Sequence, residues 1–504
     1  MPKLQEEETL MVSSPPTICF ITPPSPFLMD ERVFPALGIL KVAATARQQG
    51  YPVEHLDLNG VGNAAEVAGN HAQNTGVEVF AITATTPQLP AATEIAKVLH
   101  QVQPDCRVIL GGPHSTLTLA ALKHSTRAVS AMAQLEADFD VVIAGDGEDA
   151  IQLALEDSPP SVINADDPKG DLFLTAKRLE ELPLPARDLV DLTTYHYDID
   201  GTNVTPLVSQ LGCPFGCNFC AGRDSSMLRR PRIRSTESVI AELRHLYQVY
   251  GYRGFMFFDD ELNVNPKLPE LLLAMLKLQD ELGAEFRCRG FVKAELFTTE
   301  QADLMYQAGF RKIMCGFESG SDRVLKNINK NATKADNTRA MEISHKYGLG
   351  MKALMSLGHP GESADTVEDT LEWLVEVEPE DFDCTIITAY PGSPYYDQGV
   401  HIPEAVQTKG EAWGFEANGD WLYMKDLDYS TQADFYKGAL GDYKSYVWTD
   451  ALSPEELVQG RDSVERSVRG KLDIPYYEAT AAERFEASMG ALPGHLYRQG
   501  GEAS

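Results

Sequence analysis

Short apolar runs alternate with amphipathic helical segments along the first part of the chain. The spacing of apolar residues between the runs, for example at 38–49 and 91–102, fits one face of a helix. Strands that alternate with helices predict βαβ units, and therefore an α/β domain with a doubly wound parallel sheet. The predicted strands are 17–22, 53–57, 79–83, 107–111 and 140–144.

Small and hydroxyl-bearing residues follow three of these strands, at 83–86, 111–114 and 145–148. Doubly wound sheets bind ligands beyond the carboxyl ends of their strands. The residues at these ends would let a large, flat ligand approach the backbone. A dinucleotide site is one interpretation, but no G-x-G-x-x-G follows the first strand, which counts against it.

A second series of strands and helices begins near residue 205 and alternates six times. Six βα units are too few to close an eight-stranded barrel, so the pattern predicts an open, partial (β/α)6 barrel. Barrels carry their active sites at the carboxyl ends of the strands. The predicted strands are 206–211, 254–259, 285–292, 312–318, 352–357 and 384–389, and the predicted helices are 236–250, 267–282, 299–308, 321–328, 334–347 and 363–377.

Three further segments complete the predicted organisation. Residues 1–15 are typical of a disordered acidic lead, and residues 158–204, rich in Pro and Asp, are typical of a linker. Residues 396–504 are predicted to form a mainly helical region, with helices at 432–447 and 454–469. This region could cover the open side of the barrel, or it could be a packing or oligomer surface. The two folded domains are then 16–157 and 205–395.

Charge and composition exclude several classes of function. The chain of 504 residues has a formal net charge of −31 and a pI near 4.7, which argues against nonspecific binding to nucleic acid or an anionic membrane. No apolar run reaches the roughly 18 residues of a membrane-spanning helix, and the acidic N-terminus has no apolar signal core. We therefore expect a cytoplasmic protein whose scattered cysteines are reduced core residues.

Three cysteines lie close together directly after the first predicted strand of the barrel. Cys213, Cys217 and Cys220 have the spacing C-x3-C-x2-C, and such thiolates hold zinc or iron–sulfur clusters. A closed metal site needs four protein ligands, and no fourth Cys or His follows within twenty residues. Three thiolates on a four-iron cluster would leave one iron open to a substrate or cosubstrate. The alternatives are a zinc knuckle and a group of reduced cysteines in a loop.

With the aromatic Phe219 before its last cysteine, this motif resembles the signature of the radical S-adenosylmethionine (radical SAM) superfamily. The resemblance implies a [4Fe-4S] cluster held by the three cysteines, with S-adenosylmethionine (SAM) at the open iron. It also implies an external electron donor of the flavodoxin or ferredoxin type.

The same resemblance implies SAM contacts at the strand ends of the barrel. Asp260, Glu318 and Ser319 would approach the methionine and ribose moieties, and Arg289 would clamp the carboxylate. Each of these residues could instead form a salt bridge at the barrel rim. The family often shows G-G-E after the second strand, whereas this chain has D-D-E at 259–261, which leaves the contact to the SAM ammonium group open.

The first domain resembles the cobalamin-binding domain found before some radical SAM barrels, which is flavodoxin-like. The resemblance lies in the helix start P-A-L-G-I-L at 35–40, the turn G-G-P-H at 111–114 and the turn G-D-G-E at 145–148. The D-x-H-x-x-G motif, whose histidine ligates cobalt in many cobalamin proteins, is absent from the first loop, so cobalamin here would lack that ligand. The alternative is a flavodoxin-like fold without a cofactor.

This second resemblance implies a set of cobalamin contacts at the strand ends. His114 could approach the cofactor, or it could cap a turn. The residues that would line the nucleotide tail and the corrin edge are Thr83, Thr85, Gly111, Gly112, Gly145 and Gly147.

Together the two resemblances imply a cobalamin-dependent radical SAM enzyme that methylates an unactivated carbon through a 5′-deoxyadenosyl radical and methylcobalamin. The alternative within this class is a cyclase, rearrangement or oxidation enzyme without methyl transfer. A methylthiotransferase would need further cluster cysteines in the first domain, which has only Cys19 and Cys106. A non-catalytic cobalamin sensor would have no use for the three-cysteine motif. The substrate, a small molecule or a peptide, is left open.

Overall fold

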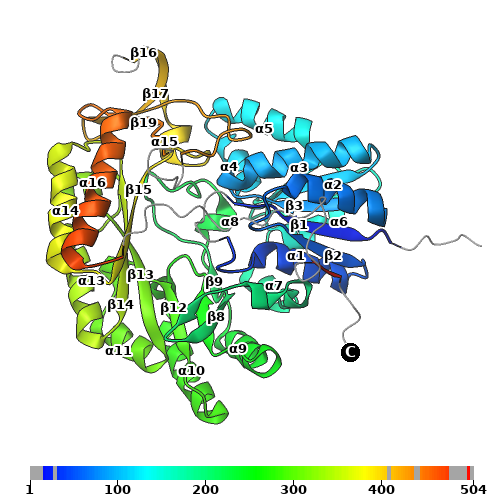
Figure 1. The fold of residues 1–504 in the computed structure, drawn as a ribbon, viewed down its shortest axis with the longest axis horizontal. Coiled ribbons are helices and arrows are strands. Elements are labelled where there is room, and N and C mark those ends of the chain that lie inside the picture. The colour runs from blue at the N-terminus through cyan, green and yellow to red at the C-terminus, as the bar shows by residue number, and fades with distance from the viewer. Residues whose placement is uncertain (1–14, 26–30, 406–409, 436–442, 476–496, 500–504) are drawn as a thin grey trace, which may run out of the picture.

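The computed structural model describes residues 15–25, 31–405, 410–435, 443–475 and 497–499 (Figure 1). The expected disordered lead, 1–15, lies almost entirely outside these residues. No helix in the described ranges is long and apolar enough to cross a membrane.

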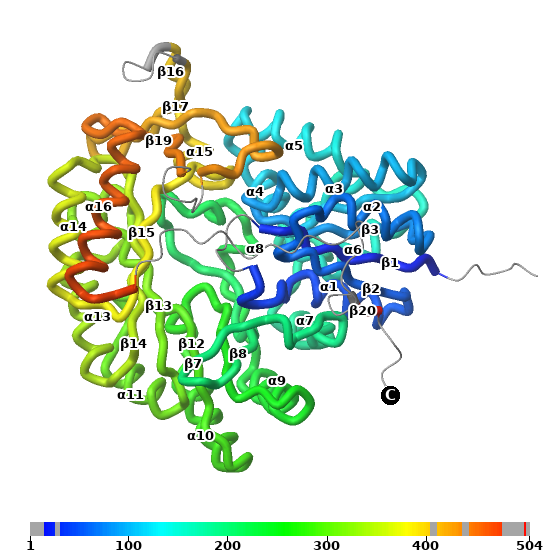
Figure 2. Tube along the Cα trace, in the orientation of Figure 1, coloured from blue at the N-terminus to red at the C-terminus, as the bar shows by residue number. Residues whose placement is uncertain are grey.

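The first sheet is parallel and doubly wound, with the strand order β2-β1-β3-β4-β5-β6. Its strands are β1 (Ile18–Thr22), β2 (Val53–Asp57), β3 (Val79–Thr83), β4 (Arg107–Gly111), β5 (Val141–Gly145) and β6 (Val162–Ala165). The start of this order, 2-1-3-4-5, is that of flavodoxin-like folds, so the predicted fold class is confirmed. A last strand, β20 (Tyr497–Gln499), pairs antiparallel with β2, and Figure 2 shows it at that edge.

Two apolar cores cover the two faces of this sheet. Ile18 and Phe20 of β1 point into the core shared with α1 and α6, whereas Cys19 and Ile21 point into the core shared with α2 and α3. This alternation follows from the two-residue period of a strand. The helices are α1 (Leu37–Gln48), α2 (Ala64–Thr75), α3 (Leu89–Val102), α4 (Pro113–Ala121), α5 (Arg127–Asp138) and α6 (Gly147–Ala154).

The second sheet is a partial barrel of six parallel strands in chain order, with its helices on the outside (Figure 1). Its strands are β8 (Thr202–Leu207), β11 (Gly254–Phe257), β12 (Arg287–Phe291), β13 (Phe310–Glu318), β14 (Gly350–Leu357) and β15 (Asp381–Ile386), with β7 (Asp198–Ile199) antiparallel to β8. The helices are α9 (Thr236–Tyr250), α10 (Leu268–Leu282), α11 (Thr299–Gln307), α12 (Asp322–Asn327), α13 (Lys334–Tyr347) and α14 (Ala364–Val377). The sheet ends at β15 and at the β7–β8 hairpin, so the predicted (β/α)6 barrel is open.

The segment between the two domains contains more structure than its composition indicates. Strand β6 adds to the first sheet, and a short helix, α7 (Ala176–Glu181), follows it. The strand predicted at 206–211 is divided, because β8 ends at Leu207 and a separate strand, β9 (Gln210–Leu211), pairs with β10 (Arg232–Ile233). The domain limits themselves stay predictions.

The C-terminal region is a mixture of strands and helices, which corrects the expectation of a mainly helical region. Its antiparallel sheet consists of β16 (Val400–Ala405), β17 (Gly410–Ala417), β18 (Asp420–Met424) and β19 (Val447–Thr449). The helix predicted at 432–447 is wrong for the described residues, which are extended or in turns there. Asn418-Gly419, both with positive φ, forms the hairpin turn between β17 and β18.

Of two helices in this region, one was predicted from the sequence and the other was not. The long helix α16 (Pro454–Leu472) agrees with the predicted helix at 454–469 and begins with a capping box between Ser453 and Glu456. It packs on α14 and β15, and so closes one edge of the barrel sheet. The one-turn helix α15 (Pro394–Asp397) was not predicted.

Candidate active site

The loop with the three cysteines follows β9 and is fixed by hydrogen bonds to neighbouring elements. The N–H of Cys213 donates to the carbonyl of Leu228 (2.9 Å), at the end of a short helix, α8 (Ser226–Arg229). The N–H of Gly212 donates to Oδ2 of Asp260 (2.8 Å). Gly212 has φ +90°, and a Cβ there would lie 2.2 Å from the Arg230 carbonyl oxygen, so this position requires glycine.

The carbonyl groups within the loop are also paired. Arg229 donates to the carbonyls of Phe215 (2.5 Å) and Pro214 (2.8 Å), and Nδ2 of Asn329 donates to that of Gly216 (2.8 Å). The backbone between the first two cysteines is therefore held from two sides, which preorganises the loop for a compact ligand.

The three thiols fit an iron–sulfur cluster by number and by electrostatics. Burial raises the pKa of Cys213 to about 11 and also raises the pKa of Cys217. These thiols would stay protonated at neutral pH unless a strong positive charge were bound beside them. Iron supplies that charge, and a coordinating thiol is then deprotonated.

Two buried lysines, missed by the sequence interpretation, lie beside this loop. Lys293 and Lys330 are 2% and 5% exposed, and both lower the pKa of Cys217 against the larger effect of burial. Nζ of Lys293 lies 4.3 Å from the Phe215 ring centroid and donates to the Lys330 carbonyl (3.1 Å). Lys293 follows a predicted strand, which is a positional signal, whereas nothing in the run around Lys330 marks it as buried.

Glu318, at the end of β13, is held in a strained and fully paired position. Its φ is +65°, which is uncommon for a residue other than glycine. Oε1 accepts from Nζ of Lys330 (2.9 Å) and Oε2 from Oγ of Ser356 (2.9 Å). Burial alone would raise the pKa of Glu318, but the Lys330 ammonium and these hydrogen bonds hold it below its usual value. A strained acidic residue next to the cysteine loop fits a binding role.

Behind Glu318, a chain of hydrogen bonds continues through a buried histidine. Ser356 Oγ lies 2.8 Å from Nε2 of His359, and Nδ1 of His359 lies 3.1 Å from the Tyr395 hydroxyl. Burial lowers the pKa of His359 to about 4, so its ring is neutral and supports Glu318 through Ser356. The ring also lies 5.4 Å from that of Phe219, in the cysteine motif.

The other residues predicted to contact SAM differ in how close they lie to the cysteine loop. Ser319 is completely buried, and its hydroxyl accepts from the N–H of Ser321 (3.1 Å). Asp260 lies beside the cysteine loop through Gly212. Arg289 lies within β12, before the strand end, and contacts the Tyr197 hydroxyl and the Met314 sulfur. The structure thus brings Asp260 and Glu318 to the cluster loop but leaves Arg289 deeper in the barrel.

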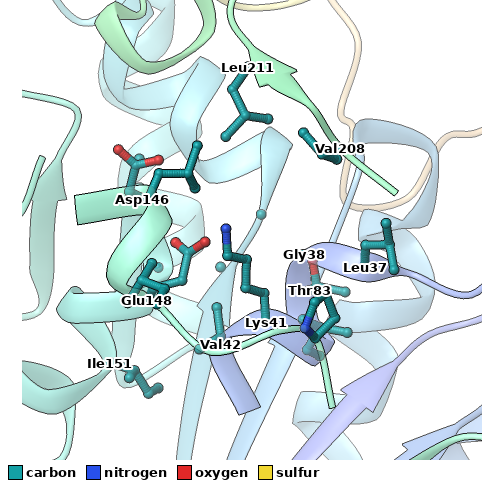
Figure 3. Close-up of a pocket in the computed structure, with 18 of the residues that line it drawn as sticks. Leu37, Gly38, Lys41, Val42, Thr83, Asp146, Glu148, Ile151, Val208 and Leu211 are labelled. Carbon is teal, nitrogen blue, oxygen red and sulfur yellow. The ribbon is translucent and has the colours of Figure 1, made fainter. Parts of the chain in front are cut away.

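Between the two domains lies a cavity of about 380 Å³ (Figure 3). One wall is the end of the first sheet, with apolar side chains such as Phe20, Ile109 and Ile143, and the other includes Leu211 and Phe258 of the barrel. The predicted cobalamin residues that line it are Thr83, Gly111, Gly112, Gly145 and Gly147.

Two predicted cobalamin residues lie outside this cavity. Thr85 caps the turn before α3 with Gln88. His114 is buried, with Nδ1 3.1 Å from the Thr86 hydroxyl, and lines a different cavity beside Tyr429. Burial lowers the pKa of His114 to about 4. Its environment fits the turn-capping alternative.

Bare backbone in the cavity wall would let a large, flat ligand approach closely. A Cβ built on Gly38 or Gly111 would meet nothing within 4 Å, so the cavity reaches the bare backbone at both positions. Among the described residues that line it there is no histidine, which agrees with the absence of the D-x-H-x-x-G motif.

Comparisons with known proteins agree with both halves of the site. Residues 31–155 match the B12 binding domain family, and residues 207–374 match the Radical SAM superfamily. An uncharacterized methyltransferase of Pyrococcus horikoshii is 26% identical over 338 residues, covering 64% of this chain and 69% of the relative. The anaerobic magnesium-protoporphyrin IX monomethyl ester cyclase of Cereibacter sphaeroides is 23% identical over 394 residues, covering 74% of this chain and 60% of the relative.

Among solved structures, the radical SAM methyltransferase TsrM of Kitasatospora setae, with cobalamin and a [4Fe-4S] cluster bound, superimposes with a TM-score of 0.62. The superposition covers 90% of each chain at 16% sequence identity, and it supports the shared fold. Fold, cysteine loop and cavity together define a cobalamin-dependent radical SAM enzyme. Within that class this chain is methyltransferase-like, and its cofactors are a [4Fe-4S] cluster, SAM and cobalamin.

Proposed function

We propose that this enzyme transfers a methyl group to an unactivated carbon of a small-molecule or peptide substrate. The observation that carries the proposal is the shared wall of the two cofactor sites. Leu211, two residues before Cys213, and Phe258, directly before Asp259, both line the cobalamin cavity. The cavity therefore opens onto the same strand ends that carry the cysteine loop.

Side-chain contacts fix the cavity relative to the cysteine loop. Asp146, in the G-D-G-E turn, forms a buried ion pair with Arg232 of β10 (2.6 Å), and β10 pairs with β9 directly before the loop. Asp166, after β6, accepts from the Ser225 hydroxyl (2.8 Å) and the Met227 N–H (2.6 Å) at the start of α8. Rigid contacts of this kind suit a reaction in which two cofactors act on one carbon.

Bound cofactors would supply the bond-breaking chemistry: the cluster gives the electron that cleaves SAM, and cobalamin carries the methyl group. The residues of the chain bind and orient. Cys213, Cys217 and Cys220 would hold the cluster, and Asp260 would keep their loop in place. Glu318 would accept hydrogen bonds from SAM.

For the SAM carboxylate we favour Lys330 over Arg289. Lys330 is buried beside Cys217 and Glu318, and its ammonium has donors beyond the one it gives to Glu318. Arg289 lies deeper in the barrel.

The remaining parts of the proposal are a cytoplasmic location, a flavodoxin- or ferredoxin-type electron donor, no nucleic acid partner, and the domain limits 16–157 and 205–395.

The test is anaerobic reconstitution with iron, sulfide and hydroxocobalamin, followed by turnover with SAM that carries a deuterated methyl group. We expect about one cobalamin and one four-iron cluster per chain, and equal formation of 5′-deoxyadenosine and S-adenosylhomocysteine with each methylated product. Cys217→Ala should lose the cluster and all turnover. Turnover in that variant would contradict the proposal.

A second candidate function, a cyclisation or oxidation without methyl transfer, is favoured by the similarity to a cyclase. It would give 5′-deoxyadenosine without S-adenosylhomocysteine and without label in the product.

A further inference from the structure

Charged residues line the cobalamin cavity, and most of them are already neutralised. Asp146 is paired with Arg232 through both carboxylate oxygens (2.7 and 2.6 Å). Glu242 is paired with Arg187 (3.0 Å) and Arg234 (2.6 Å). These groups are structural, because each charge has a partner at hydrogen-bond distance.

Lys41 differs from them. It lies on α1 among the apolar residues of Leu37–Val42, on the side of the helix that faces the cavity. Figure 3 shows its chain extended into the cavity, with the ammonium pointing toward the space between Glu148 and Leu211. Among the described residues, the ammonium has no hydrogen-bond or ion-pair partner.

Glu148, in the first turn of α6, faces the same space from the other side. Its charge counteracts the effect of burial on the Lys41 pKa more than any other group does, but no ion pair forms between the two side chains. Burial lowers the pKa of Lys41 and raises that of Glu148, which shows that each charge is poorly solvated. A cation without a direct partner is costly in a mostly apolar cavity, so the arrangement favours an anionic ligand at this point.

We propose that Lys41 recognises the phosphate in the nucleotide tail of cobalamin. The inference rests on the proposed cobalamin function. The corrin ring carries neutral amide side chains, whereas the phosphodiester is the anionic group of the tail. Gly38 and Gly111, which line the same cavity as Lys41, expose bare backbone and leave room for this part of the cofactor.

The test compares two corrinoids: hydroxocobalamin, and cobinamide, which lacks the nucleotide tail. Binding is followed by visible absorbance and does not depend on turnover. For Lys41→Met we expect cobalamin affinity to fall about tenfold or more, as for loss of a charge-assisted hydrogen bond, with cobinamide affinity unchanged within about twofold. Lys41→Arg keeps the charge and should retain cobalamin affinity.

Two further variants control for folding and for nonspecific charge. Lys177→Met removes a side chain that is 88% exposed on α7, and we expect no change with either corrinoid. Glu148→Gln removes the carboxylate that competes with the phosphate for Lys41, so its cobalamin affinity should be kept or rise. Circular dichroism and iron content establish that each variant is folded.

The outcomes separate this inference from the proposed function. Wild-type protein that binds neither corrinoid would contradict the proposed function. Wild-type protein that binds cobalamin, together with an unchanged Lys41→Met, would overturn only the role of Lys41. An equal loss of both corrinoids in Lys41→Met, or a loss of cobalamin in Glu148→Gln as large as that in Lys41→Met, would show a structural pair and overturn the inference.

Discussion

Arg232 Nη1 lies 2.7 Å from Oδ1 and 2.6 Å from Oδ2 of Asp146, so one nitrogen joins the G-D-G-E turn at 145–148 to the strand pair before the cysteine loop. Both side chains are less than 5% exposed. Removing one partner of a buried pair leaves the other charge uncompensated, which costs roughly 3–5 kcal/mol. This pair is thus one of the buried contacts that hold the cavity and the cysteine loop in their relative position.

We expect Arg232→Met to lower the free energy of unfolding by about 3–5 kcal/mol, measured by urea denaturation. The double variant Asp146→Asn/Arg232→Met should recover part of this loss. The control is Arg244→Met, at an exposed pair with Glu281, where we expect less than about 1 kcal/mol. Equal losses at both arginines would contradict a special role for the buried pair.

Gly212→Ala should prevent the cysteine loop from forming. The new Cβ would clash with the Arg230 carbonyl oxygen at 2.2 Å, and φ +90° disfavours any other residue. The measurement is iron content after reconstitution, which we expect to fall to a small fraction of wild type. Gly470→Ala, in α16, meets nothing within 4 Å and should be neutral or stabilising by up to about 1 kcal/mol. A wild-type iron content in Gly212→Ala would refute the assigned role of this glycine.

Lys330→Met should weaken SAM binding and destabilise the protein, because Glu318 would stay buried without its cation. Isothermal titration with SAM measures the first effect, and urea denaturation the second. The double variant Glu318→Gln/Lys330→Met should recover stability but not SAM affinity. If the double variant recovered both, Lys330 would be only a structural partner of Glu318.

Asp259 gives a pH dependence with a definite sign. Burial raises the pKa of Asp259 to about 7, against the hydrogen bonds from Ser209 that lower it. The folded state therefore binds a proton that the unfolded state releases, so this group's stabilising contribution is present at acidic pH and is lost as pH rises toward 7. Asp259→Asn removes this effect. We expect the variant to gain stability relative to wild type between pH 5 and pH 8, in urea denaturation of the cluster-free proteins, and a constant difference would disprove the assignment.

Most of the fold could be predicted because it follows from local periodicity. Several strands of the first sheet are short apolar runs, such as Val79–Thr83, and most helices have a clear apolar face. The antiparallel C-terminal sheet was missed although Asn418-Gly419 marks its hairpin, because only helices, at 432–447 and 454–469, were predicted in this region.

Some residues of the candidate site could also be predicted from the sequence, and others could not. The cluster ligands Cys213, Cys217 and Cys220 could be predicted because they lie close together in the sequence. Lys41 and Lys330 could not, because their places in the cavity wall and beside the cysteine loop result from tertiary packing between elements far apart in the chain. Single-residue roles of this kind become visible only when the partners of each charge are known.

Strand β20 has a consequence for biosynthesis. Residues 497–499 complete the first sheet by pairing with β2, whose residues are near position 55 (Figure 2). During translation the β2 edge is therefore uncovered until the barrel and α16 have left the ribosome. Uncovered strand edges invite pairing with other chains, so association between chains would compete with folding until β20 has paired with β2.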